Sequence, residues 1–331
     1  MSARVKRRDF IVLLGGAAAA WPLAVRAQQA AVPVVGWISS GWPDAAAGWI
    51  SAFRKGLNAA GFVEGKSVTI EYRFEEGRYD RLPVLAAELV RRPATVIMAF
   101  GGPRPTNAAK AATSTIPIVF ESLTDPVATG LVASLNRPGG NVTGVYMLSN
   151  EIGTKQLGLL RELVPAAKVI ALLVNPNTPG ADFLPKDIEP AARSLGLELR
   201  PLNAGAERDL DDTLASVGRQ RPDALIVQSD AFLTRQRIQI VQTAARYAIP
   251  TISSNRDFAT AGGLMSYGAS VADATYQAGI YVGRILKGEQ PAGLPVIQSA
   301  KFEFVINLQT AKALGLAVPP TLIARADEVI E

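Results

Sequence analysis

The stretch TVIMAFGGPRPTNAAKAATSTIPIVFES, residues 95–122, decides the fold of this chain. It begins with the apolar run Thr95–Phe100, which predicts a buried strand, and Gly101-Gly102 then opens a turn. A helix is predicted from about Pro105 to Ala112, followed by a second apolar run, Ile118–Phe120. Strands that are covered on both faces of a parallel sheet read as continuous apolar runs, so the stretch predicts a strand–helix–strand unit of such a sheet.

Units of the same kind precede this stretch. Strands are predicted over Val34–Ile38 and Val68–Tyr72, and helices over Ala45–Ala60 and about Tyr79–Arg92. Gly61 follows the first of these helices as a natural C-cap. The first half of the chain therefore alternates strands with helices throughout.

The second half repeats this order. ALIVQSDAFLTRQRIQIVQTAARYAIPTIS, residues 224–253, resembles the opening stretch, since Ile249-Pro250 precedes its last strand as Ile116-Pro117 does in the first half. Strands are predicted over 169–174, 197–199, 224–227 and 251–253, one helix ends at Gly196, and others cover about 207–219 and 234–247. Right-handed crossovers between such strands predict an α/β fold of two doubly wound parallel-sheet lobes.

Short segments join the predicted lobes. Residues 144–150 and 262–268 are the predicted linkers. Two further strands are predicted over 295–297 and 302–306, and the chain between them could form a third connection between the lobes. Several linkers at one place predict a hinge, about which two lobes close on a small ligand.

The same segments set the predicted domain limits. The N-terminal lobe is predicted to comprise residues 28–148 and part of 268–300, and the C-terminal lobe residues 149–265 and part of 300–331. A helix predicted over Val271–Lys287 carries Ala278, Gly279 and Gly283, whose small side chains permit close helix packing.

The first 27 residues read as an export signal rather than as part of the fold. Lys6-Arg7-Arg8-Asp9-Phe10-Ile11 precedes an uncharged run from Phe10 to Val25, and Val25-Arg26-Ala27 ends the segment. This pattern predicts a twin-arginine signal peptide, residues 1–27, cleaved between Ala27 and Gln28. A membrane anchor is the alternative, but the uncharged run is short for a bilayer span. The predicted location of the protein is the periplasm.

Composition excludes several classes of function. The chain has 34 Lys and Arg against 29 Asp and Glu, and without residues 1–27 the balance is 29 against 28, which gives no support to nucleic-acid binding. Because Cys and His are both absent, disulfides, thiolate nucleophiles, Ser-His-Asp triads and the usual metal sites are excluded, and no metal or cofactor is predicted. Without a lipid-accepting Cys, direct membrane anchoring is not expected.

Ligands of open α/β sheets bind beyond the carboxyl ends of the strands. The residues predicted there to contact a ligand are Ser39, Ser40, Trp42, Gly101, Gly102, Glu121, Tyr146, Asn175, Asp230, Asn255 and Tyr267. Phe100 and Phe232 lie nearby in the sequence and could cover an apolar ligand face. Together they predict a cleft for a small molecule with both polar and apolar parts.

Each of these residues also has a purely structural interpretation. Ser39, Ser40 and Asn255 could simply cap helices, and Gly101-Gly102 could be only a turn. Asp230 and Glu121 are stronger candidates, because a carboxylate at the inner end of a buried strand needs a partner such as a ligand ammonium or a protein Arg.

Two motifs resemble a known family. TDPVATGLV (124–132) followed by LNRPGGNVTGV (135–145), and FVINLQTAKALGL (304–316), are similar to sequences of ABC-transporter solute-binding proteins. The resemblance implies a type I periplasmic binding-protein fold, an ABC permease as partner and no catalytic activity, and some relatives are associated with aromatic amino acids. It also adds Thr124 and Asp125 to the candidate cleft residues.

The leading hypothesis is an exported protein that captures a small organic solute, an amino acid or related carboxylate, between two lobes and delivers it to an ABC permease. A periplasmic sensor that hands its closed form to a receptor kinase has the same fold and stays open at this point. An enzyme using Asp230 or Glu121 as acid or base is the third alternative, which the absence of His and Cys disfavours.

Overall fold

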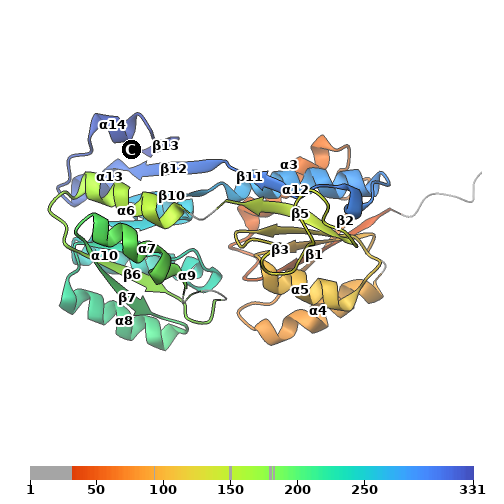
Figure 1. Ribbon diagram of the computed structural model, residues 1–331, viewed down its shortest axis with the longest axis horizontal. Coiled ribbons are helices and arrows are strands. Elements are labelled where there is room, and N and C mark those ends of the chain that lie inside the picture. Colours follow the sequence, from red (N-terminus) through yellow and green to blue (C-terminus); the bar gives the residue numbers. More distant parts are fainter. Residues whose placement is uncertain (1–31, 93, 149–150, 179–180, 182) are drawn as a thin grey trace, which may run out of the picture.

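The computed structural model describes residues 32–92, 94–148, 151–178, 181 and 183–331. The predicted signal peptide and its cleavage site lie outside the described residues. The described chain forms two sheets, each covered by helices, and Figure 1 shows them as two lobes lying next to each other.

Within the described ranges, the first sheet has six strands that all run parallel. In spatial order they are β11 (Ile297–Ser299), β5 (Val142–Met147), β4 (Ile118–Ser122), β3 (Val96–Phe100), β1 (Val34–Ser39) and β2 (Thr69–Phe74). Strand β3 sends Val96 and Met98 to one hydrophobic core, and Ile97 and Ala99 to another on the opposite face. Burial on both faces is the reason that its sequence is continuously apolar.

Helices cover both faces of the first sheet. Helices α3 (Ala47–Ala59) and α12 (Val271–Leu286) pack on one face, and α4 (Leu82–Arg91) and α5 (Pro103–Ala112) pack on the other. Two short 3-10 turns, η1 (Tyr79–Arg81) and η2 (Pro291–Gly293), complete the lobe.

The α3–α12 pair is packed backbone to backbone. A Cβ on Gly56 of α3 would overlap the carbonyl oxygen of Tyr276, and a Cβ on Gly279 of α12 would overlap that of Phe53. Gly283 lies in the same way against Ala60. The close packing predicted from the small residues of α12 is confirmed, and Gly56 is its counterpart on α3.

The second sheet has seven strands among the described residues. In spatial order they are β13 (Glu328–Ile330), β12 (Phe302–Asn307), β10 (Met265–Ala269), β9 (Thr251–Ser253), β8 (Ala224–Val227), β6 (Val169–Val174) and β7 (Glu198–Asn203). The sheet is parallel, as predicted, except that β12 runs antiparallel to β10. The chain leaves β10 toward the other lobe and enters β12 on its way back, so the two strands point in opposite directions.

Two groups of helices cover this sheet. One face packs against α6 (Ile152–Leu163), α7 (Phe183–Ser194), α13 (Leu308–Ala313) and α14 (Pro320–Ile323). The other face packs against α8 (Glu207–Gln220), α9 (Ala231–Arg235), α10 (Arg237–Arg246) and α11 (Arg256–Thr260). The helix predicted over 234–247 is two helices, α9 and α10, with Gln236 between them.

In the described chain, three connections pass between the two sheets: from β5 to α6, from β10 to α12 and from β11 to β12 (Figure 1). Backbone hydrogen bonds tie these connections together. Leu148 N–H donates to the Ser299 carbonyl (3.2 Å), and Ser270 N–H donates to the Lys301 carbonyl (2.8 Å). This arrangement is a hinge of three adjacent crossings.

The predicted details of these crossings need one correction. Much of both predicted linkers belongs to strands β5 and β10, so the actual linkers are shorter. The last two predicted strands do provide a third crossing, because β11 joins β5 in the first sheet and β12 joins β10 in the second.

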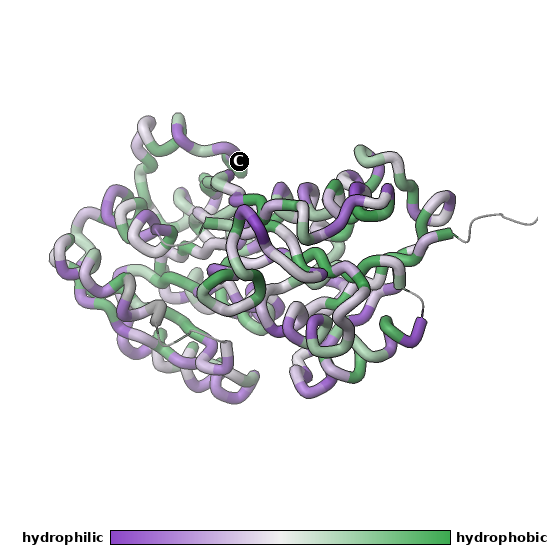
Figure 2. Tube along the Cα trace, turned by 45° about the vertical axis from the view of Figure 1, so that its right-hand side comes forward, coloured by the Kyte–Doolittle hydropathy of each residue, from purple (hydrophilic) through white to green (hydrophobic). Residues whose placement is uncertain are grey.

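Figure 2 shows hydrophilic residues concentrated on the outer helices and loops of both lobes. Among the described residues, no helix combines the length and the apolar character that a membrane crossing requires.

Candidate functional site

A cavity of about 500 Å³ lies between the two lobes. Its walls are formed by Trp42, Glu75, Glu76, Gly77, Tyr79, Arg104, Asn175, Asn177, Gly205, Ala206, Ala231 and Phe232. The first six follow strands β1, β2 and β3, and the last six follow β6, β7 and β8. The cavity therefore lies at the carboxyl ends of both sheets, where the sequence predicted the ligand site.

A tight loop after β2 carries a buried carboxylate into the cavity wall. Glu75 is 1% exposed, and its Oε1 accepts a hydrogen bond from Gly41 N–H (2.9 Å). Glu76 and Gly77 both have positive φ angles, 56° and 78°, which turn the chain back toward η1. Burial raises the pKa of Glu75, while the Gly41 and Gly77 N–H groups and the charges of Arg104 and Arg81 act in the opposite direction.

Trp42 is held between the two lobes. A Cβ on Gly77 would lie 2.9 Å from Cζ2 of its indole, so the side chain rests directly on the backbone of the Glu75 loop. From the second lobe, the Arg235 guanidinium lies 4.6 Å from the indole ring centre, which is cation–π distance, and 4.0 Å from Asp44 Oδ1. Contacts of Trp42 and Asp44 with Arg235 therefore cross from lobe to lobe.

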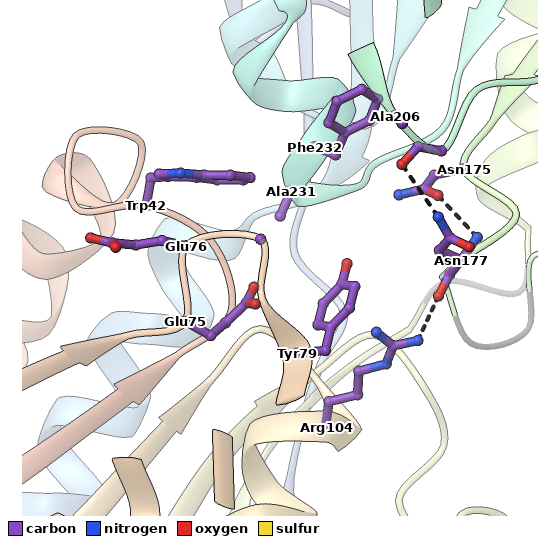
Figure 3. A pocket seen from close by; sticks show the side chains of 12 residues that line it. Trp42, Glu75, Glu76, Tyr79, Arg104, Asn175, Asn177, Ala206, Ala231 and Phe232 are labelled. Atoms are coloured by element: carbon purple, nitrogen blue, oxygen red, sulfur yellow. Dashed lines mark hydrogen bonds between the residues drawn. The ribbon is translucent and has the colours of Figure 1, made fainter. Parts of the chain in front are cut away.

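Arg104 makes a second contact across the cavity. Its guanidinium lies 3.8 Å from the ring centre of Tyr79, and its Nη2 donates a hydrogen bond to the backbone carbonyl of Asn177 in the second lobe. Burial raises the pKa of Tyr79, and the negative charge of Asp230 adds to this rise, so the hydroxyl stays protonated at neutral pH. Figure 3 shows Tyr79 and Arg104 side by side on one wall, facing Asn177 on the other.

On the second lobe, Asn175 is fixed by a network that also contains Asp230. Asn175 Nδ2 donates to Asp230 Oδ1 (3.0 Å), and Asn175 Oδ1 accepts from Asn177 N–H (2.9 Å). Asp230 also accepts from Leu233 N–H at the start of α9 (3.0 Å) and from Thr178 Oγ1 (2.7 Å). The partners that a buried carboxylate needs are thus supplied to Asp230 within its own lobe.

Of the residues predicted from the sequence, the cavity brings together Trp42 and Asn175, and it also contains Phe232. Five others belong to the first lobe and lie outside the walls that the described residues form: Ser39, Ser40, Gly101, Gly102 and Glu121. The Ser39 hydroxyl donates to the Ser40 carbonyl (2.9 Å). Glu121 Oε2 accepts from Gly101 N–H (3.3 Å), its carbonyl accepts from Gly102 N–H (3.2 Å), and burial raises the pKa of the carboxyl to about 7.

Five further candidates also lie away from the described cavity walls: Thr124, Asp125, Tyr146, Asn255 and Tyr267. Asp125 Oδ1 accepts from Val127 N–H (2.8 Å) next to Thr124, and Tyr146 is buried in the first lobe. Asn255 caps α11 through Asp257 N–H (2.9 Å), which is the structural alternative considered for it. Tyr267 stacks on Phe302 at the hinge, with 5.7 Å between ring centres. Ligand contact by these residues stays a prediction.

Several wall residues were missed in the sequence. Glu75, Glu76 and Gly77 follow β2 directly, but the predicted strand ended at Tyr72, two residues before the observed end at Phe74. Two acidic residues followed by a glycine at a strand end would have been the signal. Arg104 lies between two prolines in the first turn of α5, close to the predicted Gly101-Gly102 turn.

Known proteins are similar to this chain in sequence and in fold. The model of the family described as ABC transporter substrate binding protein matches residues 42–330. A tyrosine-binding protein of Clostridioides difficile (strain R20291) is 28% identical over 266 residues, which is 80% of this chain and 75% of that protein.

Two solved structures extend the comparison. A conserved domain protein of Vibrio cholerae O1 biovar El Tor is 26% identical with a TM-score of 0.81. An ABC domain of Streptococcus pneumoniae in complex with L-Trp is 23% identical, also with a TM-score of 0.81, and each comparison covers 90% of this chain and 99% of the other. The fold is that of the type I periplasmic binding proteins. The chain thus belongs to the ABC transporter substrate binding protein family, whose members bind ligands for transport and are not enzymes.

Proposed function

We propose that this protein is an exported solute-binding protein that captures an amino acid or related carboxylate between its lobes and delivers it to an ABC permease. The observation that carries the proposal is the cavity at the hinge-linked interface, whose walls come from both lobes. Its volume of about 500 Å³ lies within the range of small-molecule sites, roughly 300–1,000 Å³. Two lobes that share one ligand can close on it by hinge motion.

Aromatic amino acids are the ligand class that we propose. The rings of Trp42, Tyr79 and Phe232 offer faces on which an aromatic side chain could stack. Glu75 and Arg104 supply opposite charges on the same walls, which suits a zwitterion. The similarity to a tyrosine-binding protein and to a domain crystallised with L-Trp supports the same class.

Export to the periplasm and delivery to a permease complete the proposal. The twin-arginine pattern in residues 1–27 supports export, and membership in a family of ABC transporter substrate binding proteins supports a permease as the partner.

Addition of L-tyrosine or L-tryptophan is expected to make the protein more compact. A ligand that contacts both walls binds the closed form more tightly than the open form. It therefore shifts the equilibrium toward the closed form, by an amount set by the difference between the two affinities. Small-angle X-ray scattering at saturating ligand, with saturation established by calorimetry, measures the change in radius of gyration. An unchanged radius with calorimetrically bound ligand would argue against capture by closure.

Replacing Trp42 with alanine is expected to weaken L-tryptophan binding by about fivefold, because a stacking surface worth roughly 1 kcal/mol is removed from the cavity wall. Trp42→Phe is the matched control, since it keeps an aromatic ring above Gly77, and it should lose much less affinity. Calorimetry gives both affinities. Equal losses in the two variants would mean that the ligand does not use this ring.

A further inference from the structure

The carboxylate of Glu75 is engaged on one side only. Oε1 accepts from Gly41 N–H at 2.9 Å, and the nearby Gly77 N–H also favours the ionised carboxylate. Oε2 is buried and has no partner within hydrogen-bond geometry among the residues that the structure describes. The side chain belongs to the cavity wall, and Figure 3 shows its carboxylate turned inward, between Trp42 and Tyr79. A buried acceptor without a partner is unfavourable, so this oxygen needs a donor that the described chain does not provide.

Two protein cations lie near this carboxylate, but neither donates a hydrogen bond to Glu75 Oε2. Arg104 stacks on Tyr79 and donates to the Asn177 carbonyl, and Arg81 pairs with Glu76 at 3.3 Å. Both charges favour the ionised form of Glu75 without forming a hydrogen bond to it in the described structure. The missing donor therefore fits a group on the ligand.

We propose that Glu75 Oε2 accepts a hydrogen bond from the protonated amine of the ligand and so makes the cavity selective for amines. The assignment rests on the proposed function, in which the ligand is an aromatic amino acid. The rings of Trp42 and Tyr79 beside the carboxylate also favour a cation, because aromatic faces attract ammonium groups. Arg104 then remains as the positive charge for the ligand carboxylate.

The first test needs no variant. Calorimetric titration of the full chain compares L-tyrosine with its deaminated analogue, hydroxyphenylpropionate, which keeps the ring and the carboxylate. We expect L-tyrosine to bind at least about thirtyfold more tightly, which corresponds to about 2 kcal/mol and is typical of a hydrogen bond to a charged group. Equal affinities would overturn the proposal, and they are the result expected if Glu75 were instead a neutral carboxyl donating to the ligand carboxylate.

The second test is Glu75→Gln. The amide oxygen can still accept from Gly41 N–H, while an NH₂ group replaces Oε2 and cannot accept from an ammonium. L-tyrosine binding is expected to fall about thirtyfold, and the preference over hydroxyphenylpropionate should shrink to within a few-fold. Glu88→Gln is the matched control: Glu88 lies half-buried on α4, outside the cavity walls, and pairs with Arg73, so the same chemical change should leave the preference intact.

The outcomes separate the two proposals. If the wild-type protein binds L-tyrosine or L-tryptophan but Glu75→Gln, folded by circular dichroism, keeps the amine preference, the role of Glu75 is wrong and the proposed function stands. If the wild-type protein binds neither amino acid, the ligand class is wrong and the assignment of Glu75 falls with it.

Discussion

Replacement of Gly56 with alanine is expected to lower the free energy of unfolding by about 3 kcal/mol. The new Cβ would overlap the carbonyl oxygen of Tyr276 and lie 3.1 Å from the Cα of Gly279. Both are backbone atoms of α12, which cannot rotate away as a side chain would, so α3 and α12 must move apart. Their separation would loosen the core that covers one face of the first sheet. Guanidinium chloride unfolding followed by circular dichroism measures the change.

Gly48→Ala in the same helix is the control. A Cβ at Gly48 would meet nothing within 4 Å, and Gly48 lies in the first turn of α3, so the substitution should stabilise the protein by up to about 0.5 kcal/mol through helix propensity alone. The two variants are thus expected to shift stability in opposite directions. A shift in the same direction for both would show that the close contact between the helices does not determine the effect.

Strands buried on both faces could be predicted from the sequence with little error. Strand β3 is buried throughout and β6 is buried from Ile170 onward, and the predicted runs Thr95–Phe100 and Val169–Val174 match them to within one residue. Each face of such a strand packs on its own core, so every position is apolar and the signal is unambiguous.

Partners and directions of the last strands could not be predicted in this way. Strands β11 and β12 are three and six residues long, and each joins a different sheet. A short apolar run carries no information about which edge it extends. That choice depends on the hinge bonds, such as the one from Ser270 N–H to the Lys301 carbonyl.

The candidate site was predicted in part, for a related reason. The rule that ligands lie beyond strand ends predicted Trp42 and Asn175, which line the cavity. The rule identifies the edge of the sheet, but it does not say which residues at that edge reach the cavity. Ser39 was therefore included, although its hydroxyl bonds to the Ser40 carbonyl within the lobe. Glu75 was missed because Arg73 interrupts the apolar run of β2. Because β2 is an edge strand, Arg73 can pair with Glu71 and Glu88, each at 3.0 Å. Charged residues near the end of the strand make its last residue hard to recognise in the sequence.

Replacement of Glu121 with glutamine is expected to stabilise the protein by about 3 kcal/mol at pH 8 and by little at pH 4.5. Burial raises the pKa of Glu121 from 4.5 to about 7, with only the Gly101 N–H acting against the rise. Between these two values the folded protein keeps a proton that the unfolded chain has released, so stability falls as pH increases. This rise in the pKa corresponds to about 3 kcal/mol above pH 7.

Glutamine removes this pH dependence because it is neutral at both pH values and its oxygen can still accept from Gly101 N–H. Denaturant unfolding of both proteins at pH 4.5 and pH 8 gives the difference directly, and Glu189→Gln on the exposed surface of α7 should change stability by no more than about 0.5 kcal/mol at either pH. If the Glu121 variant differs from the wild-type protein equally at both values, the carboxyl does not titrate with a raised pKa. A gain at pH 8 that disappears at pH 4.5 would instead mean that the buried carboxylate of Glu121 destabilises the fold once it is ionised, and that a neutral amide removes this cost.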